Sequence, residues 1–235
     1  MPGFCLICSG QGAQDAAMVD RLLAYPGAGP LLARIRSSGV LPGGALAWLD
    51  RPGDAGDLIF RNDIAQPMVC LYQMLAWEAV KTLLPAPGIF MGYSLGELSA
   101  CGCAGVFKPA EAVRLAAARG RLMSGAAVIP QTMAAVIGLD GEQLGGICAR
   151  FNAQVAIINA ADHHVVGLPL EALPAFIAEC SKSGAARVVR LPVAVAAHTF
   201  HMREAARAFE KALLAAEFNP GGSVIAGVSG EKVFS

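Results

Sequence analysis

The chain has 235 residues, enough to bury one substantial core and to form one or two domains. Its 18 basic and 18 acidic residues cancel and are scattered without a run of like charge, which argues against nucleic acid or an anionic membrane as the main partner. Hydrophobic residues make up 55%, much of it alanine, and no apolar stretch approaches the roughly 18 residues that a transmembrane helix needs. The composition predicts a soluble globular protein.

The amino-terminal sequence MPGFCLICSGQGAQDAAM has no basic segment before its short apolar stretch, and its first charged residue is Asp15. This is not the pattern of a signal peptide, so we expect a cytoplasmic protein. The seven cysteines, an odd number, fit a reducing compartment better than a disulfide framework. Cys5 and Cys8 have CxxC spacing but lie in a strand-like run, and no second pair completes a metal site. We therefore expect all seven to be small core residues and no bound metal.

Strand and helix patterns alternate along the first 130 residues. The expected strands are residues 4–8 and 89–91, and the expected helices are residues 15–25 and 63–84, the second with Pro67 near its start. Residues 37–57 are rich in glycine, proline and serine and predict a loop with little regular structure. The alternation indicates an α/β layer structure with a largely parallel sheet.

Residues 131–191 show a different order of strand and helix patterns. Their expected elements are, in chain order, strand 133–139, helix 142–150, strands 155–159 and 164–167, helix 170–183 and strand 186–191. This β-α-β-β-α-β order is the ferredoxin-like arrangement, which is a closed unit by itself. We therefore expect an insertion at 131–191 in a catalytic α/β domain made of residues 1–130 and 192–235. In the last part of that domain we expect a helix over 199–218 and then a last apolar run over 223–228.

The segment FMGYSLGELSACG, residues 90–102, holds a serine between two glycines. The sequence Gly92-Tyr93-Ser94-Leu95-Gly96 fits a nucleophile elbow, in which a tight strand-to-helix turn lifts the hydroxyl above the sheet and flanking Cβ atoms would clash. The alternative is a serine that caps the helix, with glycines for packing. The expected strand before this turn and the helix after it favour the nucleophile.

A serine nucleophile needs a base, and the chain has four histidines. His163 and His164 fall at the edge of a strand in the expected insertion, where a surface role is the default. His198 ends a strand-like run just before Thr199 opens a helix. The positive end of the helix dipole disfavours an imidazolium there and helps to keep the ring neutral, as a general base requires. We predict His198 as the base, with His201, one turn inside the helix, as the second choice.

An acyl-transfer site also needs donors for the oxyanion. In an elbow, one donor is the backbone N–H of the residue after the nucleophile, here Leu95. A second donor can come from the turn Gly10-Gln11-Gly12, provided that its strand lies beside the elbow strand. The alternative for this turn is a plain glycine turn.

The helix expected near residues 110–123 carries Arg119 inside its apolar arc. A guanidinium at such a position requires an anionic partner, because a buried unpaired charge is very costly. Two kinds of partner are open: a protein carboxylate, Glu97 or Asp63, or the substrate.

In this order along the chain, GQGAQ, GYSLGE, AARGRLM and LPVAVAAH resemble the malonyl-CoA:acyl-carrier-protein transacylase family, which includes the acyltransferase domains of polyketide and fatty acid synthases. Each motif is weak alone, but the combination is specific and covers essentially the whole chain. The resemblance implies an α/β-hydrolase-like large domain with a ferredoxin-like insertion. It also implies that Ser94 is the nucleophile, His198 the base, Gln11 and the Leu95 amide the oxyanion hole, and Arg119 the clamp for the free carboxylate of malonyl.

The expected activity is transfer of malonyl from malonyl-CoA, through a Ser94 acyl-enzyme, to the phosphopantetheine-type thiol of an acyl carrier protein, without a permanently bound cofactor. Within the family, GYSLGE and IINAADHHVVGLP look most like the epsilon subunit of malonate decarboxylase, which loads that complex's own carrier subunit. The other subunits of such a complex would be further partners. The alternative functions are a serine thioesterase or esterase with water as acceptor, and a catalytically silent subunit that docks a carrier protein.

The sequence departs from the family pattern at two places. The family usually has histidine where this chain has Tyr93, so the contact that this histidine makes to the acyl unit is not implied here. The family also typically continues beyond the position of Ser235 with a further strand and helices, including the segment whose carbonyl orients the catalytic histidine. The source of that orientation for His198 is therefore not given by this sequence.

Overall fold

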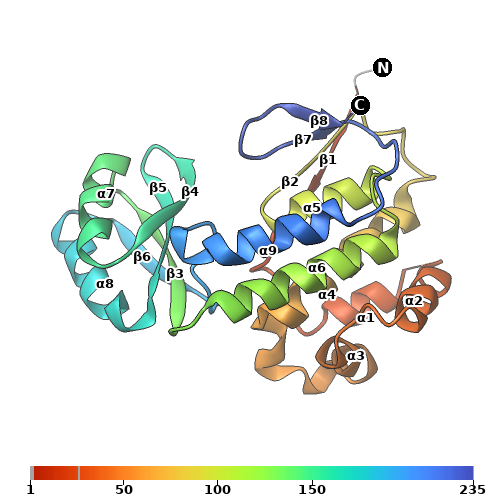
Figure 1. Cartoon of the computed structure of the whole chain (residues 1–235), viewed down its shortest axis with the longest axis horizontal. Coiled ribbons are helices and arrows are strands. Elements are labelled where there is room, and N and C mark those ends of the chain that lie inside the picture. The colour runs from red at the N-terminus through yellow and green to blue at the C-terminus, as the bar shows by residue number, and fades with distance from the viewer. Residues whose placement is uncertain (1–2, 26, 235) are drawn as a thin grey trace. The chain divides into compact units, whose positions relative to one another are not determined.

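A computed structural model describes residues 3–25 and 27–234, which form two compact units (Figure 1). The first unit combines the residues up to Gly120 with those from Lys211 onward, and the second is Arg121–Glu210. The insertion expected at residues 131–191 lies within the second unit, and its limits stay a prediction. Ser235, beyond which the family typically continues, falls outside the described residues.

The first unit is built on a four-stranded sheet of order β1-β2-β7-β8. Its strands are β1 (Cys5–Cys8), β2 (Ile89–Gly92), β7 (Val224–Ile225) and β8 (Lys232–Phe234). The strands β1, β2 and β7 run parallel and only β8 is antiparallel to its neighbour, which confirms the largely parallel sheet. The expected strand 89–91 is present but only half-buried, since Phe90 is buried while Ile89 is 41% exposed.

Among the residues described, six α-helices begin in the first unit. They are α1 (Met18–Leu23), α2 (Ala28–Ser37), α3 (Gly43–Asp50), α4 (Asn62–Val80), α5 (Leu95–Cys103) and α6 (Pro109–Ala126). The expected loop over residues 37–57 is wrong, because α3 and two short 3-10 turns, Pro52–Asp54 and Gly56–Phe60, occupy much of it. Burial of Trp48 and Leu49 outweighs the low helix propensity of the glycines. Gly44 also permits a close approach, since a Cβ there would meet the side chain of Ile64.

The second unit contains an antiparallel sheet of order β4-β5-β3-β6. Its strands are β3 (Gln131–Ile137), β4 (Gln154–Ala160), β5 (His163–Pro169) and β6 (Arg187–Leu191). Helices α7 (Gly141–Arg150) and α8 (Leu173–Lys182) complete the β-α-β-β-α-β order and lie on the same face of the sheet (Figure 1). This order and topology confirm the ferredoxin-like prediction.

Two apolar layers hold the second unit together, one on each face of its sheet. The first joins Val136 and Val166 to α7 and α8 and includes the fully buried Phe176. The second joins Met133 and Val165 to the segment after β6, with Val195, Ala197, Met202 and Ala205. The backbone on both sides of residue 198 is therefore anchored to the sheet.

Two smaller expectations from the sequence are wrong. The helix expected over 199–218 is instead a 3-10 turn, Phe200–Met202, followed by α9 (Arg203–Leu214). Cys5 is exposed and Cys101 only partly buried, so the expectation that all seven cysteines are core residues is wrong; Cys5 shares the exposed face of β1 with Ile7, since alternate residues of a strand lie on the same face. In the part of the chain that the structure describes, the helices are too short or too polar to cross a membrane. Over the same residues, no group of three or more potential ligand side chains is arranged for a metal ion.

Candidate active site

Ser94 lies in a tight turn between β2 and α5. Its backbone has φ 55° and ψ −110°, a strained conformation for a residue with a side chain. A Cβ on Gly92 would run into the backbone of Gly96, and a Cβ on Gly96 would run into the carbonyl of Cys8. The two glycines of GYSLG are thus required by the close approach of three backbone segments. The turn has the geometry that the sequence predicts for a nucleophile elbow.

The turn after β1 lies directly beside this elbow. Strands β1 and β2 pair in parallel with Cys8 opposite Gly92, and the Tyr93 N–H donates to the Cys8 carbonyl at 3.0 Å. A Cβ on Gly10 would lie only 2.8 Å from the Tyr93 carbonyl oxygen. The strand that precedes Gln11 is therefore the neighbour of the elbow strand, which is the arrangement that a second oxyanion donor requires.

Two glutamines fix the turn after β1. Gln14 is buried, its Oε1 accepts from the Gly12 N–H at 2.6 Å, and its Nε2 donates to the Ile59 carbonyl at 2.9 Å. Gln73 of α4 donates to the carbonyl and the hydroxyl of Ser9, both at 2.9 Å. On the elbow side, the Leu95 N–H is the first of α5 and has no acceptor within the helix. Backbone donors in such fixed positions are suited to an oxyanion.

Arg119 lies in α6, which touches α4 so closely that a Cβ on Gly120 would meet the Asn62 carbonyl. Its guanidinium donates from Nη1 to the Oε1 of Gln66 at 2.8 Å and from Nη2 to the hydroxyl of Ser94 at 3.3 Å. Burial lowers the pKa of the Arg119 guanidinium, and the carboxylate of Glu97 acts in the opposite direction. Arginine still carries its charge at neutral pH, so a partly buried cation lies next to the serine hydroxyl.

The carboxylates considered as partners for Arg119 are engaged elsewhere. Asp63 accepts two hydrogen bonds from Arg61, at 2.8 and 3.2 Å, and Glu97 accepts the Gly227 N–H at 2.6 Å. Among the residues that the structure describes, no carboxylate lies within ion-pair distance of Arg119. This arrangement favours an anionic group of the substrate as its partner.

His198 lies in the second unit, where its side chain is exposed and its backbone has φ 60°. The next residue, Thr199, caps the 3-10 turn: its hydroxyl donates to the Ala196 carbonyl at 2.6 Å and accepts from the His201 N–H at 3.3 Å. Gly167 of β5 lies under this loop, since a Cβ there would be 2.7 Å from the Thr199 methyl group. His198 therefore stands directly before a capped 3-10 turn, as expected, but the strand-like run expected before it is wrong, because residues 192–198 form bends and turns.

The other three histidines have different surroundings. Nε2 of His201 donates to the Asn152 carbonyl at 3.0 Å, which ties that ring to the loop before β4. His163 is partly buried. His164 is only 1% exposed in β5, so the expected surface role is wrong for it, because it shares with Val166 the face of the sheet that α7 and α8 cover, close to Gly141.

Gln66 is the residue of this site that the sequence reasoning missed. It is 1% exposed in α4 and contacts Arg119 from 53 positions away. The available signal was a glutamine inside an apolar helix face, between Ala65 and Pro67. A polar side chain there needs a hydrogen-bond partner, but the sequence does not say which one.

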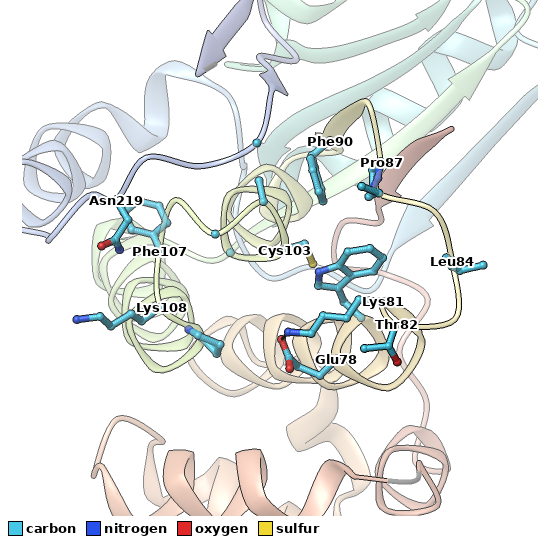
Figure 2. A pocket seen from close by; sticks show the side chains of 17 residues that line it. Glu78, Lys81, Thr82, Leu84, Pro87, Phe90, Cys103, Phe107, Lys108 and Asn219 are labelled. Atoms are coloured by element: carbon cyan, nitrogen blue, oxygen red, sulfur yellow. Dashed lines mark hydrogen bonds and ion pairs between the residues drawn. The ribbon is translucent and has the colours of Figure 1, made fainter. Parts of the chain in front are cut away.

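One pocket of the first unit, about 940 Å³ in volume, has other lining residues (Figure 2). Its wall includes Phe90, Cys103, Phe107 and two lysines, Lys81 and Lys108. Neither the elbow serine nor the buried arginine lines it. The volume of a cavity alone therefore does not locate the candidate site in this protein.

A serine in a tight turn between a parallel strand and a helix is typical of α/β-hydrolase-like enzymes. Over residues 5–228 the sequence matches the acyl transferase domain family, and the chain belongs to this family. It is 34% identical over 232 residues to the malonyl CoA-acyl carrier protein transacylase of Escherichia coli strain K12, covering 93% of this chain and 72% of that protein. The corresponding transacylase of Mycobacterium bovis is 32% identical over 211 residues, with 88% and 68% covered.

Solved structures agree with this assignment. A malonyl-transacylase in complex with its type II polyketide synthase acyl carrier protein has a TM-score of 0.86 and 27% identity, covering all of this chain and 77% of that one. The malonyl CoA-acyl carrier protein transacylase of Coxiella burnetii has a TM-score of 0.82 and 25% identity, covering 99% and 75%. These likenesses confirm the family resemblance and the fold class expected from the sequence.

Proposed function

We propose that this protein moves a malonyl group from malonyl-CoA to the phosphopantetheine-type thiol of an acyl carrier protein, through an acyl-enzyme on Ser94. Membership of the acyl transferase family and the names of its relatives support the reaction class. One observation carries the substrate class: the Arg119 guanidinium lies 3.3 Å from the Ser94 hydroxyl and has a neutral amide as its other hydrogen-bond partner. A cation so placed suits an acyl group that bears its own carboxylate.

In the first half-reaction, His198 accepts the proton of the Ser94 hydroxyl as Oγ attacks the thioester carbonyl carbon. The carbonyl oxygen becomes an oxyanion and accepts hydrogen bonds from the backbone N–H groups of Leu95 and Gln11. The intermediate collapses when the carbon–sulfur bond breaks. The departing coenzyme A thiolate takes the proton from His198, which leaves malonyl-Ser94.

The second half-reaction runs through the same groups in reverse. The carrier's thiol gives its proton to His198 and attacks the ester carbonyl of malonyl-Ser94. Collapse of the second oxyanion returns the proton to the serine oxygen and releases the malonyl-carrier thioester. The scheme is a ping-pong reaction with no permanently bound cofactor.

The position of Arg119 limits the length of the acyl group. In malonyl a single CH₂ separates the reacting carbonyl from the distal carboxylate, so a carboxylate bound by Arg119 stays within reach of Ser94. A bidentate guanidinium–carboxylate pair is directional as well as strong, and it would orient the thioester for attack.

Narrower features of this proposal rest on the sequence. The likeness of GYSLGE and IINAADHHVVGLP to the malonate decarboxylase epsilon subunit suggests the carrier subunit of such a complex as the acceptor, with other subunits as partners. The expected cytoplasmic location also stays a prediction. Purified carrier proteins compared as acceptors of the malonyl group would identify the preferred one.

Intact-mass measurement after brief exposure to malonyl-CoA tests the proposal. A malonyl adduct that persists in water and disappears when a holo carrier protein is added supports transfer. Rapid release of coenzyme A without an adduct would instead indicate a thioesterase. A protein that gives neither product but still binds a carrier would indicate a docking subunit.

A further inference from the structure

Gln66 connects the partly buried Arg119 to helix α4. Its side chain is 1% exposed, and its Oε1 accepts from Nη1 of Arg119 at 2.8 Å. The other terminal nitrogen, Nη2, donates to Ser94 at 3.3 Å. The guanidinium is thus held between an amide on one side and the serine hydroxyl on the other.

The partner that α4 offers to Arg119 is neutral. A buried carboxylate at this point would form a charge-assisted pair with the guanidinium and cancel its charge, whereas an amide oxygen orients the group and leaves the charge in place. The residue one turn earlier on the same face, Asn62, is another buried amide. The acidic residue next to it, Asp63, is paired with Arg61. The face of α4 that meets α6 therefore carries amides and no carboxylate at this level.

We propose that Gln66 is a positioning and specificity-determining residue: it fixes the direction of Arg119 without neutralising it, so that the site selects acyl groups with a free carboxylate over neutral acyl groups. This inference rests on the proposed malonyl transfer and adds the reason for its selectivity. The uncompensated charge is offset when the substrate's carboxylate binds. An acetyl group leaves it unpaired.

Gln66→Glu tests the neutrality of the partner directly, because glutamate has nearly the same shape and keeps the acceptor oxygen. It would supply Arg119 with an internal counter-ion. We expect kcat/KM for malonyl-CoA to fall by roughly 10-fold to 100-fold, the range of one charge-assisted pair. We expect kcat/KM for acetyl-CoA to stay within about threefold or to rise, so the preference shrinks or inverts.

Gln66→Leu provides a second test that introduces no charge. It removes the acceptor and leaves the cation, so we expect KM for malonyl-CoA to rise more than kcat falls. The variant should still prefer malonyl-CoA over acetyl-CoA. The matched control is Gln143→Glu, the same chemical change at the exposed third position of α7. A capping box accepts glutamate there as well as glutamine, so both donors should be used as in the wild type.

The rate of Ser94 acylation is measured by intact mass with each donor, together with the melting temperature with and without sodium malonate. Malonate should stabilise the wild type and Gln143→Glu but not Gln66→Glu. Parallel losses with both donors, or an unchanged preference in Gln66→Glu, overturn this inference alone. If the wild type itself is not malonylated, the proposed function fails and this inference fails with it.

Discussion

Replacing Arg119 with alanine separates a substrate clamp from a structural cation. The change removes hydrogen bonds to Gln66 at 2.8 Å and to Ser94 at 3.3 Å, and it leaves the buried Gln66 oxygen without that donor. The loss of a hydrogen bond from a charged donor costs about 1.5–3 kcal/mol. The change also removes a partly buried charge that has no ion pair with a carboxylate among the described residues, which acts in the opposite direction. We therefore expect a net loss of stability of less than about 2 kcal/mol, which corresponds to about 4–8 °C in melting temperature at most.

The effect on catalysis should be larger and should depend on the donor. Truncating one partner of a hydrogen-bonded charge pair costs on the order of 2 to 5 kcal/mol. At about 1.4 kcal/mol per tenfold, kcat/KM for malonyl-CoA should fall by roughly 30-fold or more. Acetyl-CoA has no carboxylate to lose, and the variant lacks the cation that acetyl cannot pair. The kcat/KM for acetyl-CoA should therefore be equal to or higher than that of the wild type.

Arg114→Ala is the matched control, because it removes an arginine from the same helix. Arg114 is 41% exposed and pairs with Glu111 three residues earlier, and such pairs contribute about 0–1 kcal/mol. Both donors should work as in the wild type. Acylation rates with the two donors and the melting temperature are measured on one preparation of each protein. Parallel losses of both donors in Arg119→Ala, together with a large fall in melting temperature, would refute the clamp.

Three further changes test the elbow and the base. Ser94→Ala should abolish the malonyl adduct and leave the fold intact, as judged by circular dichroism; a persistent adduct would contradict the nucleophile. His198→Ala should slow acylation far more than His201→Ala, because the His201 ring is tied to a backbone carbonyl, and equal losses would leave the base unassigned. Gly96→Ala should lower the free energy of unfolding by about 1–3 kcal/mol or more, because the new methyl group would meet the carbonyl of Cys8 at the end of β1. The control Gly145→Ala has open space around the new methyl group and should leave the stability unchanged or raise it. Equal melting temperatures for the two alanine variants would show that the elbow does not need its glycine.

Local patterns carried most of the fold prediction. The order of the second unit follows from strands and helices whose periodicity is visible over short windows, and its topology follows from the β-α-β-β-α-β order. The elbow was predictable for the same reason, since Gly92 and Gly96 lie where other backbone segments come so close that a side chain would clash. Helix α3 was missed because the burial of Trp48 stabilises a segment whose glycines and prolines favour a loop.

The sequence alone could not show which residues far apart in the chain contact each other. The helical wheel indicated that Arg119 is buried, but it could not choose among Glu97, Asp63 and a substrate. The structure adds that both carboxylates have other partners and that Gln66 is the side chain in contact. His164 was misjudged for a related reason, since only the pairing of β5 on both sides shows that its strand is central.

Backbone strain adds an argument for the catalytic pair that does not depend on any motif. Among the residues that the structure describes, three that are not glycine have positive φ: Ser94, Asn152 and His198. Asparagine and histidine enter this region more readily than most residues, whereas serine does so less often, and a sparsely populated backbone conformation costs on the order of 1–3 kcal/mol and persists only where the surroundings impose it. At Ser94 the packing of Gly92 and Gly96 imposes it, and at His198 the anchored residues on either side do so. Strain of this kind gathers at functional sites, and here it occurs at the two residues that the motifs independently assign as nucleophile and base.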